Sequence, residues 1–98
     1  MIHVSICFDK DKAFKSITII GHGDNLVCAG VSSCFIGSIN ALQDIDNFIY
    51  QVNEGDSFIK AKNKVSEHDK VVLETLFVQL ITISNKYPKD VKISRERI

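Results

Sequence analysis

The sequence lacks a surplus of charge of either sign. Twelve lysines and arginines balance twelve aspartates and glutamates, so the formal net charge at pH 7 is zero. Proteins that bind nucleic acid or an anionic membrane through their overall field carry an excess of basic residues. We therefore expect no direct binding of nucleic acid and no attachment to a membrane.

Long hydrophobic runs are also missing. The first residues, MIHVSICFDKDK, turn charged after Phe8 and lack the basic start of a secretory signal. No run approaches the roughly eighteen apolar residues of a membrane-spanning helix. The three cysteines, Cys7, Cys28 and Cys34, are odd in number and lack C-x-x-C spacing, which favours a reducing compartment over a disulfide scaffold. These absences predict a cytoplasmic protein.

Motifs for metal ions and phosphates are absent as well. The histidines and cysteines are nowhere at zinc-ligand spacing, and no G-x-x-x-x-G-K-[ST] segment is present. We therefore expect neither a metal ion nor another cofactor. What remains is an ordinary globular composition, 45% hydrophobic and 24% charged, in 98 residues that suffice for a single domain, 1–98.

Four segments have the features of β-strands, and together they contain five strands. Residues 2–8 alternate apolar and polar side chains with a period of two, and residues 13–20 follow after the turn DKDK, which predicts a hairpin. The segment 48–64 contains two more strands around the turn NEGDS. A final strand is predicted in DVKISRERI, residues 90–98.

Two segments have the 3.6-residue period of amphipathic helices. The first is expected from Val27 to about Asn47. The second begins at Ser66, where S-x-x-D resembles a capping box, and ends before Pro88. The order ββαββαβ predicts an α+β fold, with a mostly antiparallel sheet and two packed helices.

Both predicted helices have features that predict a further packing partner. A line of small residues in the first helix predicts that another helix or a backbone lies close to it: Gly30, Ser33, Gly37 and Ala41. The second helix has more apolar surface than one buried face requires. This surplus predicts a homodimer, and it comes from Val71, Phe77, Val78 and Ile81.

The segment GHGDNLVCAG, residues 21–30, brings an imidazole and a thiol together between a predicted strand and a predicted helix. The N-terminus of a helix carries about half a positive charge and unpaired N–H groups, which favour a thiolate. His22 and Cys28 could therefore form a nucleophilic pair, with an oxyanion hole from the backbone N–H groups of Cys28 and Ala29. The alternative is a helix-capping loop with a buried structural cysteine.

The same residues resemble the signature of the ribosomal-processing cysteine proteases, the Prp (YsxB-like) family. That signature is a Gly-His pair, a loop, and a run of the type D-(I/V)-V-C-A-A-V-S that opens a helix. Here it reads Gly21-His22, a loop, and LVCAGVS at 26–32. The later segment LETLFVQLITISNKYP also resembles the second helix of the family.

The resemblance implies a Cys-His dyad, with His22 as the base and Cys28 as the nucleophile. Ser32 matches a family serine linked to substrate binding or site support. The implied substrate and partner is the N-terminal extension of large-subunit ribosomal protein twenty-seven, cut after a short apolar segment that contains Phe. The family is also homodimeric.

Two departures from the family pattern concern the loop. It is about six residues shorter than in many relatives, and the position three before the cysteine, often Asp, is Asn25, with Asp24 beside it. Asp24 is an alternative group to orient His22, so both residues are candidates for site support.

The remaining thiols and imidazoles have structural interpretations. Cys34 is about 240° around the helix from Cys28 and falls in the core stripe, and Cys7 is expected to be structural. His3 is expected on the sheet surface and His68 in the first turn of the second helix. Two other functions remain open: a non-catalytic ribosome-associated binding module, and a small thiol redox protein, which the lack of a resolving cysteine disfavours.

Overall fold

The computed structural model describes residues 1–97, and in this part of the chain the elements follow the predicted order ββαββαβ. The elements are β1 (Ile2–Phe8), β2 (Phe14–Gly21), α1 (Asn25–Ala41), a 3-10 turn (Ile45–Asn47), β3 (Phe48–Gln51), β4 (Asp56–Ala61), α2 (Glu67–Lys86) and β5 (Val91–Arg97). Ile98, which was expected at the end of the last strand, lies outside the described residues.

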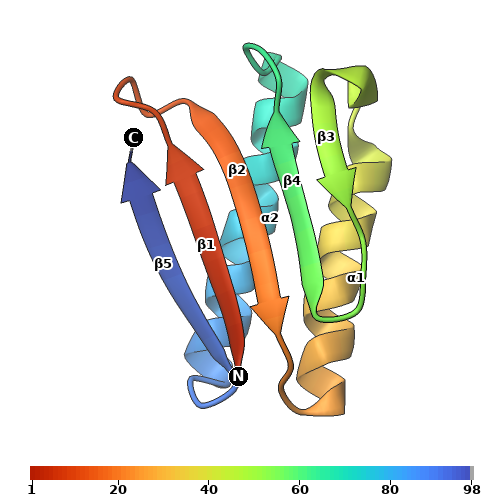
Figure 1. Ribbon diagram of the computed structural model, residues 1–98, viewed down its shortest axis with the longest axis vertical. Helices are drawn as coiled ribbons and strands as arrows, with labels where there is room; N and C mark the ends of the chain where they lie inside the picture. The colour runs from red at the N-terminus through yellow and green to blue at the C-terminus, as the bar shows by residue number, and fades with distance from the viewer. Residues whose placement is uncertain (98) are drawn as a thin grey trace.

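The strands form one mixed sheet in the order β3-β4-β2-β1-β5. All neighbouring pairs are antiparallel except β1 and β5, which are parallel, so the predicted mostly antiparallel sheet is confirmed. Both helices lie on the same face of this sheet and pack side by side (Figure 1). The molecule is therefore a two-layer α+β domain.

The core fills the space between the sheet and the helices. The period-two pattern of β1 directs Ile2, Val4 and Ile6 into it, and the hydrophobic stripes of α1 and α2 meet them from the other layer. Most of the core consists of buried aliphatic side chains, among them Ile17, Val31, Ile59, Leu73, Leu76 and Leu80, with Phe35 as the largest.

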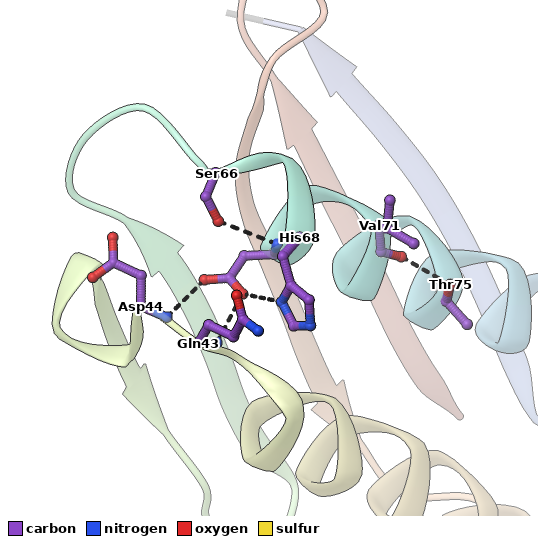
Figure 2. Close-up of polar contacts among 7 residues, drawn as sticks. Gln43, Asp44, Ser66, His68, Val71 and Thr75 are labelled. Atoms are coloured by element: carbon purple, nitrogen blue, oxygen red, sulfur yellow. Dashed lines mark hydrogen bonds and ion pairs between the residues drawn. The ribbon is translucent and has the colours of Figure 1, made fainter.

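Helix α1 ends at Ala41, six residues before the predicted end near Asn47. The chain leaves the helix at Leu42, and the N–H groups of Gln43 and Asp44 donate to the two carboxylate oxygens of Asp69, at 2.8 and 3.0 Å. Figure 2 shows these contacts, with Gln43 and Asp44 on one side and the start of α2 on the other. A side chain of α2, about 25 residues later in the sequence, thus holds the chain where α1 ends.

The same carboxylate explains why the S-x-x-D pattern is only half of a capping box. Ser66 caps α2 as predicted, because its hydroxyl accepts from the Asp69 N–H at 3.3 Å. The Asp69 carboxylate does not return to Ser66; it holds Gln43 and Asp44, and His68 Nδ1 lies 2.9 Å from Oδ1. His68, which had no predicted partner, belongs to this cluster.

The small residues of α1 have a close neighbour at one end only. Gly30 faces α2, where a β-carbon would lie 3.8 Å from Ile83, but a β-carbon at Gly37 would meet nothing within 4 Å. Around Gly37 the two helices leave an open groove of about 430 Å³. The apolar surplus of α2 is likewise divided: Phe77 packs against Phe8, whereas Val71 and Val78 are exposed.

Asp69 is fully buried, and its ionisation is linked to the stability of the fold. Burial acts to raise the pKa of the carboxyl, but the N–H groups of Gln43 and Asp44 together with His68 outweigh it and hold the pKa below its ordinary value of 3.8. The ionised form of Asp69 is therefore more favoured in the folded chain than in the unfolded one.

Replacement of Asp69 by Asn keeps the shape of the side chain and removes its charge. We expect the free energy of unfolding at neutral pH to fall by about 1–3 kcal/mol, because the backbone N–H groups of Gln43 and Asp44 lose a charged acceptor. Since the folded pKa is below 3.8, the contribution of the carboxylate is present above that pH and is lost as the pH falls through the folded value. Urea unfolding at a series of pH values measures this difference.

Asp46→Asn is the matched control, because Asp46 is exposed on the 3-10 turn. This variant should unfold like the wild type. A difference between wild type and Asp69→Asn that stays constant down to pH 2 would contradict the linkage.

Candidate active site

Two turns meet at one end of the sheet, the β2–α1 connection and the β3–β4 turn (Figure 1). The Gly21 N–H donates to the Gly55 carbonyl oxygen at 3.0 Å, which joins the two turns directly. Gly21 has a φ of +100°, and a β-carbon there would overlap the carbonyl oxygen of Met1. Glycine is therefore required immediately before His22.

His22 directly follows the last residue of β2, and its ring packs against Gly55. Gly55 has a φ of +74°, and a β-carbon there would overlap the ring, at 2.8 Å from Cε1 and nearer still to Nε2. The absence of a side chain at Gly55 thus makes the space that the imidazole occupies. The His22 side chain itself is exposed to solvent.

Cys28 is the fourth residue of α1, and its thiol is half-buried at the start of the helix. The Gly23 N–H donates to Sγ at 3.3 Å, and the thiol in turn donates to the Gly23 carbonyl oxygen at 3.5 Å. Side chains of a helix lean toward its N-terminus, where the unpaired N–H groups carry partial positive charge. The Gly23 peptide and the N-terminal end of the helix therefore both lie beside this sulfur.

Asp24 is the N-cap of α1, and the helix begins at Asn25 rather than at the predicted Val27. Its carboxylate accepts from the Leu26 N–H at 3.1 Å, while its own N–H donates to Asp90 Oδ1 at 3.1 Å. The carboxylate is engaged at the helix end rather than at His22. Asp90, between α2 and β5, is a positioning residue that sequence reasoning missed.

The earlier helix start removes the predicted oxyanion hole. The Cys28 N–H donates to the Asp24 carbonyl oxygen at 2.9 Å, as the first regular hydrogen bond of the helix. Ala29 is the next helical residue, and its N–H is committed in the same way. The prediction that the backbone of Cys28 and Ala29 binds an oxyanion is therefore wrong in this arrangement.

Four of the predicted site residues line one cavity of about 150 Å³, which we call the Cys28 cavity: His22, Asn25, Cys28 and Ser32. Asn53, Glu54 and Gly55 close it from the β3–β4 turn. Asp24 and Ala29 are not part of its lining. Among residues 1–97, no hydrogen bond joins His22 to Cys28, and catalytic pairs often come within bonding distance only when substrate is bound.

The other cysteines lie away from this cavity. Cys7 is on β1, with its thiol 4.0 Å from the Phe8 carbonyl oxygen, and Cys34 packs partly against the core. His3 is exposed on the sheet, as predicted. In the described part of the chain, no group of three His, Cys, Asp or Glu side chains is placed to hold a metal ion. None of the helices within 1–97 has the length and hydrophobicity that crossing a bilayer requires.

The chain matches known proteins along most of its length. The family described as Cysteine protease Prp matches residues 1–92 of the chain. The chain belongs to the Prp family of cysteine proteases. It is 26% identical to the ribosomal processing cysteine protease Prp of Staphylococcus aureus, over 96% of this chain and 98% of that protein. The resemblance seen in the Gly-His and LVCAGVS segments is confirmed.

Solved structures share the fold of this chain. The crystal structure of the Staphylococcus aureus Prp protease with a covalently linked product peptide superposes with a TM-score of 0.85 at 25% identity, covering 97% of this chain and 99% of that one. A protein of Streptococcus mutans shares the fold at 19% identity, with a TM-score of 0.82, over 100% of this chain and 99% of that one. Of the three functions left open by the sequence, Prp membership selects the protease.

The contact between His22 and Gly55 can be tested with a pair of glycine variants. Gly55→Ala should destabilise the chain by about 1–2 kcal/mol, because the φ of +74° and the His22 ring both oppose a β-carbon. Gly37→Ala is the control, and it should stabilise the chain by about 0.5–1 kcal/mol, since Gly37 is helical and faces open space. Urea unfolding gives both values. A Gly55→Ala variant as stable as the wild type would contradict both the positive φ of Gly55 and the packing of the His22 ring on it.

Proposed function

We propose that this Prp-family protease removes the N-terminal extension of a precursor of large-subunit ribosomal protein twenty-seven, with Cys28 as nucleophile and His22 as its base. The observation that carries the proposal is the Cys28 cavity, in which His22 and Cys28 are both on the lining and the Gly23 N–H points at the sulfur. The Staphylococcus aureus relative is a ribosomal processing protease, and its structure contains a covalently linked product peptide.

The proposed reaction is an acyl transfer through the Cys28 sulfur. His22 takes the thiol proton, the thiolate attacks the carbonyl carbon of the scissile bond, and the imidazolium returns the proton to the leaving amine. Water then hydrolyses the thioester with His22 again as the base, which releases the new carboxylate and restores the thiol. The exposed imidazole must leave its resting place on Gly55 to reach the sulfur, and its exposure permits that rotation.

The tetrahedral intermediate needs donors other than the Cys28 and Ala29 N–H groups. Asn25 lies on the lining of the Cys28 cavity, one helical turn before the nucleophile, and its carboxamide supplies N–H donors. We assign Asn25 this role together with the Gly23 N–H, which lies at the sulfur and becomes available as the sulfur electron pair forms the bond to the carbonyl carbon. An Asn25→Ala variant with unchanged kcat would remove Asn25 from the mechanism.

Ser32 follows Cys28 by four residues on the same face of α1 and lines the same cavity. Its exposed hydroxyl is positioned to hydrogen-bond the backbone of a bound peptide, which agrees with the role that the family resemblance implies. A cytoplasmic location and a homodimer belong to the same proposal. The exposed Val71 and Val78 of α2 support a dimer contact on the helical layer, and sedimentation of the purified chain tests it.

The nucleophile is tested by a pair of cysteine variants. Cys28→Ala should lower cleavage of a synthetic precursor peptide by more than about a thousandfold while the chain still folds and binds the peptide, because only the sulfur is lost. Cys34→Ala is the matched control on the same helix, with turnover retained and a stability loss of about 1 kcal/mol. Mass analysis of the peptide products measures cleavage. Turnover that survives Cys28→Ala and disappears in Cys34→Ala would show that the nucleophile is Cys34.

A further inference from the structure

A second cavity, of about 170 Å³, adjoins the Cys28 cavity. We call it the Ile36 cavity. The two share lining residues from both sides, among them Val31 and Ser32 of α1 and Asn53 and Glu54 of the β3–β4 turn. They therefore form one continuous groove between α1 and the β3–β4 hairpin, which leads away from the nucleophile.

The chemistry of the groove changes along its length. Near Cys28 it is lined by polar groups, the Asn25 side chain and the Ser32 hydroxyl. Beyond Ser32 the wall becomes apolar, because Phe35, Ile36 and Val52 are added. Ile36 and Val52 remain 41% and 46% exposed, so both can contact a ligand in the groove.

The spacing along α1 sets how far this apolar wall is from the nucleophile. Cys28, Ser32 and Ile36 follow one another at intervals of four residues, which places them on one face of the helix. At about 1.5 Å per residue, Ser32 and Ile36 lie roughly 6 and 12 Å beyond Cys28. An extended peptide advances about 3.3 Å per residue, so these distances correspond to roughly two to four residues of substrate.

We propose that the Ile36 cavity binds one large apolar side chain of the peptide substrate, two to four positions from the scissile bond, and that Ile36 and Val52 select it. The proposal rests on the protease function proposed above, because the occupant is the peptide held at Cys28. Glu54 lies on the lining of both cavities, and its exposed carboxylate adds discrimination against an acidic side chain at that position. Selection thus combines apolar contact with charge repulsion.

The test uses the full chain and a set of synthetic peptides built on the precursor sequence. In each peptide, one apolar side chain two to four positions from the scissile bond, on either side, is replaced by Glu. Wild-type kcat/KM should fall by about tenfold or more for the peptide whose altered position enters the Ile36 cavity. Val52→Lys should raise kcat/KM for that peptide about tenfold over wild type and lower it for the parent peptide.

Ile49→Lys is the matched control, because Ile49 is an exposed apolar residue on β3 of the same hairpin and lines neither cavity. It should leave every kcat/KM value within about twofold of wild type. Val52→Ala supplies a second variant without new charge, with kcat/KM for the parent peptide about tenfold lower. All three substitutions are at exposed positions, and thermal unfolding checks that the variants fold.

The proposal is supported if Val52→Lys, and not Ile49→Lys, raises kcat/KM for one of the Glu-substituted peptides. Recovery by neither variant, or by both alike, overturns it while leaving the protease function intact. A wild-type chain that cleaves no peptide of the set overturns the protease function, and the inference fails with it.

Discussion

The hydrogen bond from the Gly21 N–H to the Gly55 carbonyl oxygen is the contact on which the candidate active site depends. It holds the β3–β4 turn against the residues that follow β2, and the missing side chain of Gly55 leaves space for the His22 ring. The same turn places Asn53 and Glu54 on the lining of the Cys28 cavity. The site is therefore built between two turns that are more than thirty residues apart in the sequence, and the rigid sheet beneath keeps them in register.

Cys28, the proposed nucleophile, is positioned from the other side of the same connection. Asp24 starts α1 by capping it, and Asp90 holds the Asp24 N–H, so the helix end is tied to the loop before β5. The cap sets Asn25 as the first residue of the helix, so that Cys28 is its fourth residue. Its sulfur then contacts both polar groups of Gly23. The Gly23 N–H donates to the sulfur, and the Gly23 carbonyl oxygen accepts from the thiol. Local capping chemistry thus decides what the thiol contacts.

The periodic patterns of the sequence were sufficient to predict the fold, because period two and period 3.6 directly reflect which side chains are buried. The helix boundaries were less predictable. Asp24 displaced the start of α1 by two residues, which was enough to remove the oxyanion hole expected at Cys28 and Ala29. The end of α1 depends on Asp69, a carboxylate from the other helix. The turn NEGDS was recognised as a turn, but its approach to His22 is a tertiary contact that no local pattern contains.

The proposed dyad requires that the Cys28 sulfur, and not another thiol of the chain, reacts as the nucleophile. Site-resolved alkylation with iodoacetamide at pH 6, followed by mass spectrometry of each cysteine peptide, measures this most directly. We expect Cys28 to be alkylated far faster than Cys7 or Cys34, because it alone of the three lies on the lining of the Cys28 cavity, with His22 on the same lining and the Gly23 N–H directed at its sulfur. Slow alkylation at similar rates for all three cysteines would contradict the assignment of Cys28 as the nucleophile.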